Sequence, residues 1–275
     1  LFSLAKKYKK KYSSKIGVLT FEPMPKMFFN KNLNNFRISS LQQKIDNLKN
    51  LNIDFLIINK FDRKFSKIKS VTFIKEILGK KLKPKFIFVS NNFRFGNKRE
   101  GNVRQLIKFE RMYGYKVVKP QPLLTNKKIA SSSWVRNLLQ KGKLEKANKI
   151  LNRNWSIVGK VQKGKQLGKK IGFPTANIDI KNYILACPGV YVVKVKRHGK
   201  NSYIKGIANL GYRPTFNGKK ILLEVHLFNF SGNLYNKYLT VEFVKFIRKE
   251  KKFKNIDQLK KQIKADLLIA KKYNE

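Results

Sequence analysis

Cysteine and acidic residues are scarce in this sequence. Its 275 residues include one cysteine, Cys187, and 15 Asp and Glu against 63 Lys and Arg. A single cysteine excludes an internal disulfide and predicts a reducing, cytoplasmic location. Cys187 adjoins Pro188 between apolar residues, which favours a buried structural thiol over a nucleophile. No stretch approaches the roughly 20 apolar residues that cross a membrane, so we expect no membrane partner.

The shortage of acid leaves a formal net charge of +48. Such a charge favours anionic substrates in general. It also permits an interpretation from another class, a basic nucleic-acid-binding protein. The lysines are spread along the whole length, however, and asparagine and isoleucine are abundant with them, which is typical of a biased genome. Because clustered aromatic residues for base stacking are also lacking, nucleic acid is the weaker interpretation. The sequence does not indicate an oligomeric state.

Length and a hydrophobic content of 42% predict two globular domains, which we place at 1–150 and 151–275. In the first, apolar runs alternate with helical patterns, which predicts a parallel sheet with helices on both faces. The predicted strands are 16–21, 53–59, 85–90 and 115–118. From Trp155 onward the pattern predicts an antiparallel barrel and a terminal helix. The predicted barrel strands are 155–161, 190–195, 203–210, 221–227 and 238–247.

A stretch rich in glycine and lysine, residues 159–177, predicts a phosphate-binding loop. Glycine lets backbone N–H groups approach anionic oxygens, and lysine offsets their charge. The residues concerned are Gly164, Gly168, Lys170 and Gly172. Pro174 then stiffens the chain, and in an extended segment Thr175 and Asn177 point to the same side. Their oxygens are hard, neutral ligands that suit Mg²⁺ bound to a nucleotide. An ordinary exposed loop is the plainer alternative.

Glu224 lies within an apolar run, 222–227, whose alternation places it and His226 on the face opposite Leu223 and Val225. A carboxylate inside a strand is informative in a chain so poor in acid. Beside a magnesium–nucleotide site it can accept the proton of an attacking hydroxyl. The alternative is a charge partner for a nearby lysine, and we favour the base. We assign His226 a structural or supporting role.

Two further groups of candidates lie in the first domain. Asn92, with Phe93 and Phe95 around a cationic residue, offers hydrogen bonds and ring stacking to a planar ligand. A surface loop whose rings anchor it in the core fits equally well. Hydroxyls at a helix start, with an arginine one turn later, make an anion site or simply cap the helix. These residues are Ser132, Ser133 and Arg136.

Two features of the second domain complete the set. Arg248 follows a predicted strand and can hold a phosphate or an ordering carboxylate. Residues 209–215 contain glycine and proline and predict a second turn.

Together these motifs resemble the bacterial bifunctional riboflavin kinase/FAD synthetase family along essentially the whole chain. The second half carries Gly-Lys-Lys-Ile-Gly-Phe-Pro-Thr-Ala-Asn (168–177), Pro-Gly-Val-Tyr (188–191), Ala-Asn-Leu-Gly-Tyr-Arg-Pro-Thr (208–215), Leu-Glu-Val-His-Leu (223–227) and Ile-Arg-Lys-Glu (247–250). The first half carries Leu-Thr-Phe-Glu-Pro-Met-Pro (19–25), Asn-Phe-Arg-Phe-Gly (92–96) and Ser-Ser-Ser-Trp-Val-Arg (131–136).

The resemblance implies a Rossmann-like nucleotidylyltransferase domain followed by a small Greek-key barrel with a C-terminal helix. The barrel would transfer the ATP γ-phosphate to riboflavin and give FMN, with Thr175 and Asn177 holding Mg-ATP and Glu224 as base. The first domain would adenylylate FMN to FAD. The resemblance places Ser132, Ser133 and Arg136 near ATP. The flavin-binding candidates are Asn92, Phe95, Phe29 and Arg248.

The family pattern is incomplete in one region. A His-x-Gly-His phosphate-binding motif belongs just before residue 1, and Met24 stands where a histidine is usual. We therefore expect a chain without its extreme N-terminus, whose intact form makes FAD. The alternative is a riboflavin kinase with an inactive first domain.

Overall fold

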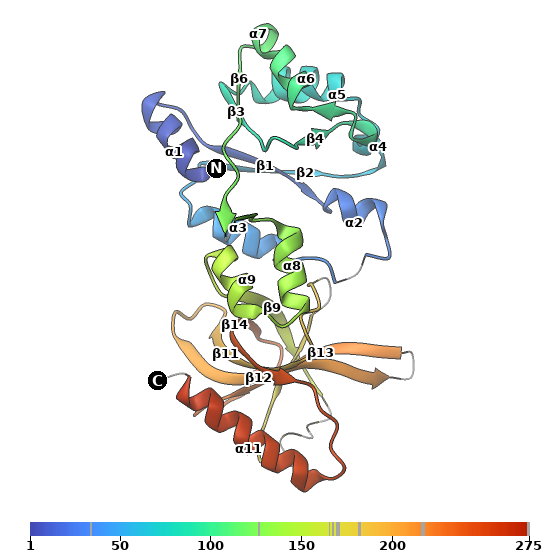
Figure 1. Cartoon of the computed structure of the whole chain (residues 1–275), viewed down its shortest axis with the longest axis vertical. Helices are drawn as coiled ribbons and strands as arrows, with labels where there is room; N and C mark the ends of the chain where they lie inside the picture. The colour runs from blue at the N-terminus through green and yellow to red at the C-terminus, as the bar shows by residue number, and fades with distance from the viewer. Residues whose placement is uncertain are drawn as a thin grey trace. The chain divides into compact units, whose positions relative to one another are not determined.

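The structure is a computed structural model that describes residues 1–33, 35–125, 127–164, 166, 168, 171–180, 183–215 and 218–273. It divides into two compact units (Figure 1). The first comprises Leu1–Leu33 and Ile45–Ile129, and the second Asn34–Lys44 and Ala130–Glu275. The second unit therefore includes a short segment from the first half of the chain. The functional boundary at 150/151 stays a prediction.

The first unit is built from parallel strand pairs, as its alternating pattern predicts. Strand β1 (Gly17–Glu22) pairs in parallel with β2 (Phe55–Lys60), and β3 (Phe86–Phe88) with β6 (Lys116–Val118). In the described part of the chain these are two separate pairs rather than one continuous sheet. The apolar residues Ile74, Leu106 and Tyr115 form the centre of its core.

Short helices and two small hairpins complete this unit. The helices are α1 (Phe2–Lys11), α2 (Pro25–Phe29), α3 (Leu41–Lys49), α4 (Arg63–Ser66), α5 (Ser70–Thr72), the π-helix η1 (Phe73–Leu82), the 3-10 helix η2 (Asn97–Arg99), α6 (Val103–Lys108) and α7 (Glu110–Tyr113). The hairpin strands are β4 (Arg94–Phe95) with β5 (Gly101–Asn102), and β7 (Leu124–Thr125) with β8 (Lys128–Ile129). Helix α3 begins in the segment assigned to the second unit.

The second unit is a closed antiparallel barrel, which confirms the predicted architecture. Its strands are β9 (Trp155–Gln162), β10 (Ala176–Asp179), β11 (Gly189–Arg197), β12 (Tyr203–Thr215), β13 (Gly218–Leu227) and β14 (Tyr238–Lys249). They close in the order β10-β13-β12-β11-β14-β9. Helices α8 (Ser132–Gln140) and α9 (Leu144–Leu151) precede the barrel, and α11 (Ile256–Lys272) follows it and lies along one side (Figure 1).

Strand alternation decides what the barrel encloses and what it presents. Leu223 and Val225 point inward to a core that includes Trp155 and Phe243. Burying each side chain of this kind contributes about 1.5–3 kcal/mol. The outer face carries a second apolar layer, including Val192 of β11, which packs against α11. The barrel is thus covered by a helix on the face where the polar residues of β13 also emerge.

Two further observations concern Cys187 and the length of the helices. Cys187 is buried, in agreement with its predicted structural role. Among the described residues, no helix combines the length and apolar character needed to cross a bilayer.

Candidate functional site

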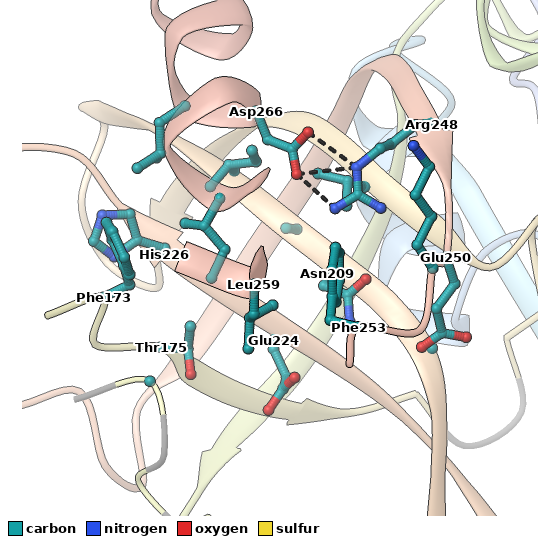
Figure 2. A pocket seen from close by; sticks show the side chains of 18 of the residues that line it. Phe173, Thr175, Asn209, Glu224, His226, Arg248, Glu250, Phe253, Leu259 and Asp266 are labelled. Carbon is teal, nitrogen blue, oxygen red and sulfur yellow. Dashed lines mark hydrogen bonds and ion pairs between the residues drawn. The ribbon is translucent and has the colours of Figure 1, made fainter. Parts of the chain in front are cut away.

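A pocket of about 400 Å³ opens on the outer face of the barrel beneath α11 (Figure 2). Apolar residues make up one part of its wall, among them Val190, Ile207, Leu259 and Leu267. Polar and charged residues from β12, β13 and the end of β14 line the other part. The predicted site residues found in this wall are Gly168, Thr175, Glu224 and Arg248.

Glu224 reaches the pocket because of its position in β13. Its neighbours Leu223 and Val225 are buried inside the barrel, so Glu224 emerges on the outside, as the alternation predicts. The register places Glu224 opposite Asn177 of β10 on one side and opposite Asn209 of β12 on the other. Directly opposed residues share a face, so these three form one row across the outer surface.

Thr175 directly precedes β10 and lines the same pocket as Glu224. Figure 2 shows its hydroxyl and the Glu224 carboxylate pointing toward the same edge of the view. A Cβ at Gly168 would overlap the carbonyl of Phe173 and lie 3.2 Å from the Thr175 hydroxyl oxygen. Glycine at 168 therefore permits a close approach of the loop to Thr175.

Asn177, which is opposite Glu224 in the sheet, is only 7% exposed. Its carboxamide oxygen Oδ1 is buried and has no hydrogen-bond partner in the described part of the chain. A Cβ at Gly164 would overlap the Asn177 carboxamide, so the loop closes directly over it. An unpartnered buried carboxamide oxygen, two residues after a threonine in the chain, has the chemistry that a hard cation such as Mg²⁺ prefers. Asn177 and Gly164 are not part of the pocket wall itself.

The remaining loop residues contribute less to the geometry. Gly172 has a φ of 89°, and a Cβ there would meet nothing within 4 Å. Position 172 therefore favours glycine because of its backbone conformation, and not because a neighbouring group packs closely against it. Lys170 lies outside the described residues.

Arg248 is held by a carboxylate that the sequence analysis missed. Its Nε donates to both oxygens of Asp266 at 3.0 and 3.1 Å, and its Nη2 donates to Oδ2 at 2.7 Å. Asp266 is 2% exposed and also accepts from Gln262 at 2.9 Å. The sequence did contain a signal for this ion pair. Asp266 is an acidic residue that directly precedes Leu267, and Leu267 belongs to the apolar stripe of α11. The sequence allowed Arg248 to bind either a phosphate or a carboxylate that orders it. The structure contains the carboxylate, that of Asp266.

The predicted turn at 209–215 was wrong. These residues continue β12, which runs to Thr215. The carboxylate of Glu250 lies against Gly211, where a Cβ would overlap it unless the Glu250 side chain shifted. Both Gly211 and Glu250 line the pocket, and neither was predicted as a site residue.

The flavin candidates of the first unit differ in exposure. Phe29 is 68% exposed at the end of α2 and makes an edge-on contact with Phe61. Asn92 accepts a hydrogen bond from the Ser90 hydroxyl at 2.9 Å in an exposed turn. Phe95 is 8% exposed and belongs to the core. For Phe95 the structure therefore favours the alternative of a ring that anchors its loop.

The nucleotide candidates of the first half lie at the start of α8, in the second unit. Ser131 is the N-cap, and its hydroxyl accepts from Trp134 N at 3.2 Å. Ser132 and Ser133 occupy the first turn and are exposed. Arg136 stacks over the Phe36 ring at 3.7 Å and donates its Nε to the Phe36 carbonyl at 2.9 Å. Burial lowers the pKa of Arg136.

Comparison with known proteins covers both halves of the chain. A riboflavin kinase family model matches residues 151–274, and an FAD synthetase model matches residues 1–134. A bifunctional riboflavin kinase/FMN adenylyltransferase of Buchnera aphidicola subsp. Schizaphis graminum is 41% identical over 96% of this chain and 86% of that protein. One of the same description from Haemophilus influenzae is 38% identical over 94% and 83%.

A solved structure described as a macrolide-efflux protein from Streptococcus pneumoniae matches with a TM-score of 0.85 and 26% identity, over 98% of this chain and 88% of that one. The two family models follow one another along the chain in the order FAD synthetase, then riboflavin kinase. The chain belongs to the bifunctional riboflavin kinase/FMN adenylyltransferase family.

Proposed function

We propose that the pocket beneath α11 is the riboflavin kinase site and that Glu224 is its general base. The row formed by Asn177, Glu224 and Asn209, with Thr175 at its end, supports this proposal most directly. It places the Glu224 carboxylate and the Thr175 hydroxyl in the wall of a largely apolar pocket, with the Asn177 carboxamide in the same row of the sheet. The chain makes FMN from riboflavin and ATP there, and its other half makes FAD from FMN and ATP.

The apolar part of the wall accounts for flavin binding. A flat isoalloxazine ring gains by leaving water for a surface formed by residues such as Ile207 and Leu259. This orientation directs the ribityl chain toward the polar edge. We assign Arg248, fixed by Asp266, to contact the flavin end of the pocket.

Phosphoryl transfer then needs a base and a place for the phosphates. Glu224 takes the proton of the riboflavin 5′-hydroxyl while that oxygen forms a bond to the γ-phosphorus of ATP. The bond from the γ-phosphorus to the bridging oxygen breaks, and ADP leaves with the electron pair. We assign the backbone N–H groups at Gly164 and Gly168 to bind the phosphates.

Thr175 and Asn177 would hold the magnesium ion of Mg-ATP. The unpartnered Asn177 Oδ1 supports this assignment. When bound, the ion would supply charge neutralisation to the phosphates. Asn177 is fixed by its strand and by the loop over it, so its oxygen needs little reorganisation to bind a cation.

For adenylylation we assign Ser132, Ser133 and Arg136 to ATP and Asn92 and Phe29 to the flavin. The phosphate of FMN attacks the α-phosphorus of ATP, and pyrophosphate leaves. Phe95 contributes by anchoring the Asn92 loop in the core. The cytoplasmic location stays a prediction from cysteine content.

The test replaces the proposed base. We expect Glu224→Gln to lower the turnover number for FMN formation by about 10²–10⁴-fold, because the amide cannot accept the proton. The melting temperature should stay near that of the wild type. Glu145→Gln, a change at an exposed glutamate in α9, is the matched control and should leave turnover unchanged. Wild-type turnover in Glu224→Gln would contradict the base assignment.

Product analysis tests the second activity. Incubation of the chain with riboflavin and Mg-ATP, followed by separation of flavins, should give FMN and then FAD. FMN alone would support the alternative in which the first domain is inactive.

A further inference from the structure

His226 makes a contact directly beside Thr175 in the chain, at the edge of the proposed kinase site. It lies on the outer face of β13, two residues after Glu224, and lines the same pocket. Its Nδ1 is 2.8 Å from the carbonyl oxygen of Pro174. Pro174 directly precedes Thr175, the proposed metal ligand. Figure 2 shows His226 beside Phe173, at the end of the pocket where Thr175 lies.

The contact occurs where the strand ladder stops. The pairing of β10 with β13 begins at Ala176, which is opposite Val225. Pro174 lies just before this point and has no N–H with which to continue a ladder. Its carbonyl meets the His226 side chain of the neighbouring strand. The His226 ring extends the pairing of the two strands beyond the last backbone bridge.

The chemistry of the acceptor determines the protonation of the ring. A carbonyl oxygen only accepts hydrogen bonds, so Nδ1 of His226 must carry the proton. In the neutral ring this leaves Nε2 as an acceptor. Two aromatic side chains contact the ring edge-on, Phe173 at 6.1 Å and Phe228 at 6.0 Å between centroids. They restrict its rotation, so the donor stays directed at Pro174.

We propose that His226 is a positioning residue of the kinase reaction. By donating from Nδ1 to the Pro174 carbonyl, it fixes the peptide group that carries Thr175, and with it the distance from the Thr175 hydroxyl to Glu224. This inference rests on the proposed roles of Thr175 and Glu224. Without the bond, the segment before β10 is tied to β13 only from Ala176 onward, and Thr175 gains freedom.

Two substitutions separate the donor from the bulk of the ring. Asparagine places an amide donor near the position of Nδ1, whereas glutamine places one near Nε2. His226→Gln should raise KM for Mg-ATP about five- to tenfold, the effect of one lost hydrogen bond, with a smaller change in kcat. His226→Asn should recover most of that loss. His198→Gln, at the other histidine, is exposed and should behave as the wild type.

A spectroscopic measurement tests the tautomer directly. The chain has only two histidines, so ¹⁵N-histidine labelling gives two imidazole spin systems, and His198→Gln assigns them. Near neutral pH we expect the Nδ1–H form for His226. The Nε2–H form would overturn the inference.

The kinetic outcomes distinguish the inference from the site assignment on which it rests. A raised KM in His226→Gln, partial recovery in His226→Asn and similar melting temperatures support positioning. Equal losses of activity and melting temperature in both variants would overturn it in favour of a purely structural role, and wild-type KM in both would also overturn it. Thr175→Val and Glu224→Gln are measured alongside. If these two turn over normally, it is the proposed site that fails.

Discussion

At the scale of single residues, close approach explains why glycine occupies particular positions around the site. Gly164 lies against the carboxamide of Asn177, and Gly168 against the carbonyl of Phe173. A side chain at Gly164 would displace the Asn177 carboxamide that the proposed mechanism uses, and one at Gly168 would displace the backbone just before Thr175. Gly172, by contrast, has open space and needs glycine only for its backbone angle. Glycine therefore occupies these three positions of one loop for different physical reasons: close packing at the first two, and backbone conformation at the third.

Replacement of Gly164 tests this argument. In Gly164→Ala the new methyl group must displace the Asn177 carboxamide, at a cost of about 1–3 kcal/mol. We expect KM for Mg-ATP to rise about tenfold, measured in the FMN assay at several Mg²⁺ concentrations. Gly17→Ala is the control, because the nearest atom to its Cβ would be 3.8 Å away. An unchanged KM in Gly164→Ala would show that Asn177 does not need its present position.

At the scale of elements, segment 34–44 is held to the barrel by several hydrogen bonds. Ser40 and Gln43 form a capping box, with Ser40 N donating to Gln43 Oε1 at 2.9 Å and Gln43 N to Ser40 Oγ at 3.2 Å. Gln43 Nε2 also donates to Ser156 Oγ at 2.8 Å, and Tyr183 donates to Gln43 Oε1 at 2.8 Å. The indole N–H of Trp155 donates to the Ile38 carbonyl. One buried glutamine thus caps α3 and joins it to β9.

Gln43→Ala should destabilise the second unit by about 2–3 kcal/mol, because it leaves several buried partners unpaired. Both tryptophans of the chain, Trp134 and Trp155, lie in this unit, so their fluorescence during urea unfolding reports on it selectively. Gln140→Ala, at an exposed position in α8, should change stability by less than about 0.5 kcal/mol. Equal curves for the two variants would contradict the importance of the buried network.

In the first unit, Asp54 joins α1 to the start of β2. The hydrogen bond from Lys9, at 2.6 Å, and then that from Ile16 N, at 2.7 Å, lower the pKa of Asp54 from 3.8. A group whose pKa is lower in the folded state contributes stability above its unfolded pKa, and this contribution is lost as pH falls through the folded value.

Asp54→Asn should therefore lower the melting temperature at neutral pH, and the difference from the wild type should vanish well below pH 3.8. Circular dichroism at both pH values makes the comparison. Since Asp54 lies outside the second unit, tryptophan fluorescence should report little change. A difference that persists at low pH would mean that the carboxylate charge is not responsible.

At the scale of the whole molecule, the net charge of +48 is a general property that does not by itself select a particular ligand. A charge of this size attracts any polyanion at low salt, and the attraction falls steeply as salt rises. The proposed kinase pocket instead recognises its substrates by an apolar wall and a few placed polar groups.

We therefore expect binding to a random-sequence DNA duplex at low salt that is lost near physiological ionic strength, measured by fluorescence anisotropy. FMN formation should change much less over the same range, since buried interactions are screened less. Tight, sequence-dependent binding at physiological salt would instead support the nucleic-acid alternative.

The sequence by itself determined the features that depend on local pattern. Alternation in residues 222–227 predicted that Glu224 leaves the barrel core, and it does. The change from alternating strands and helices to strands and turns predicted two architectures in the right order. Each of these rests on interactions within one element, whose period is visible in the chain.

Only the tertiary structure decided which distant residues meet. The Asp266 carboxylate pairs with Arg248 from a different element, and the Glu250 carboxylate lies against Gly211 in a strand whose end the sequence predicted as a turn. Phe95 turned inward, although its loop composition fitted a ligand contact equally well. The His226–Pro174 contact arises where a strand ladder stops. Such contacts depend on strand register and helix placement, which are set by packing across the whole unit and leave no local period in the sequence.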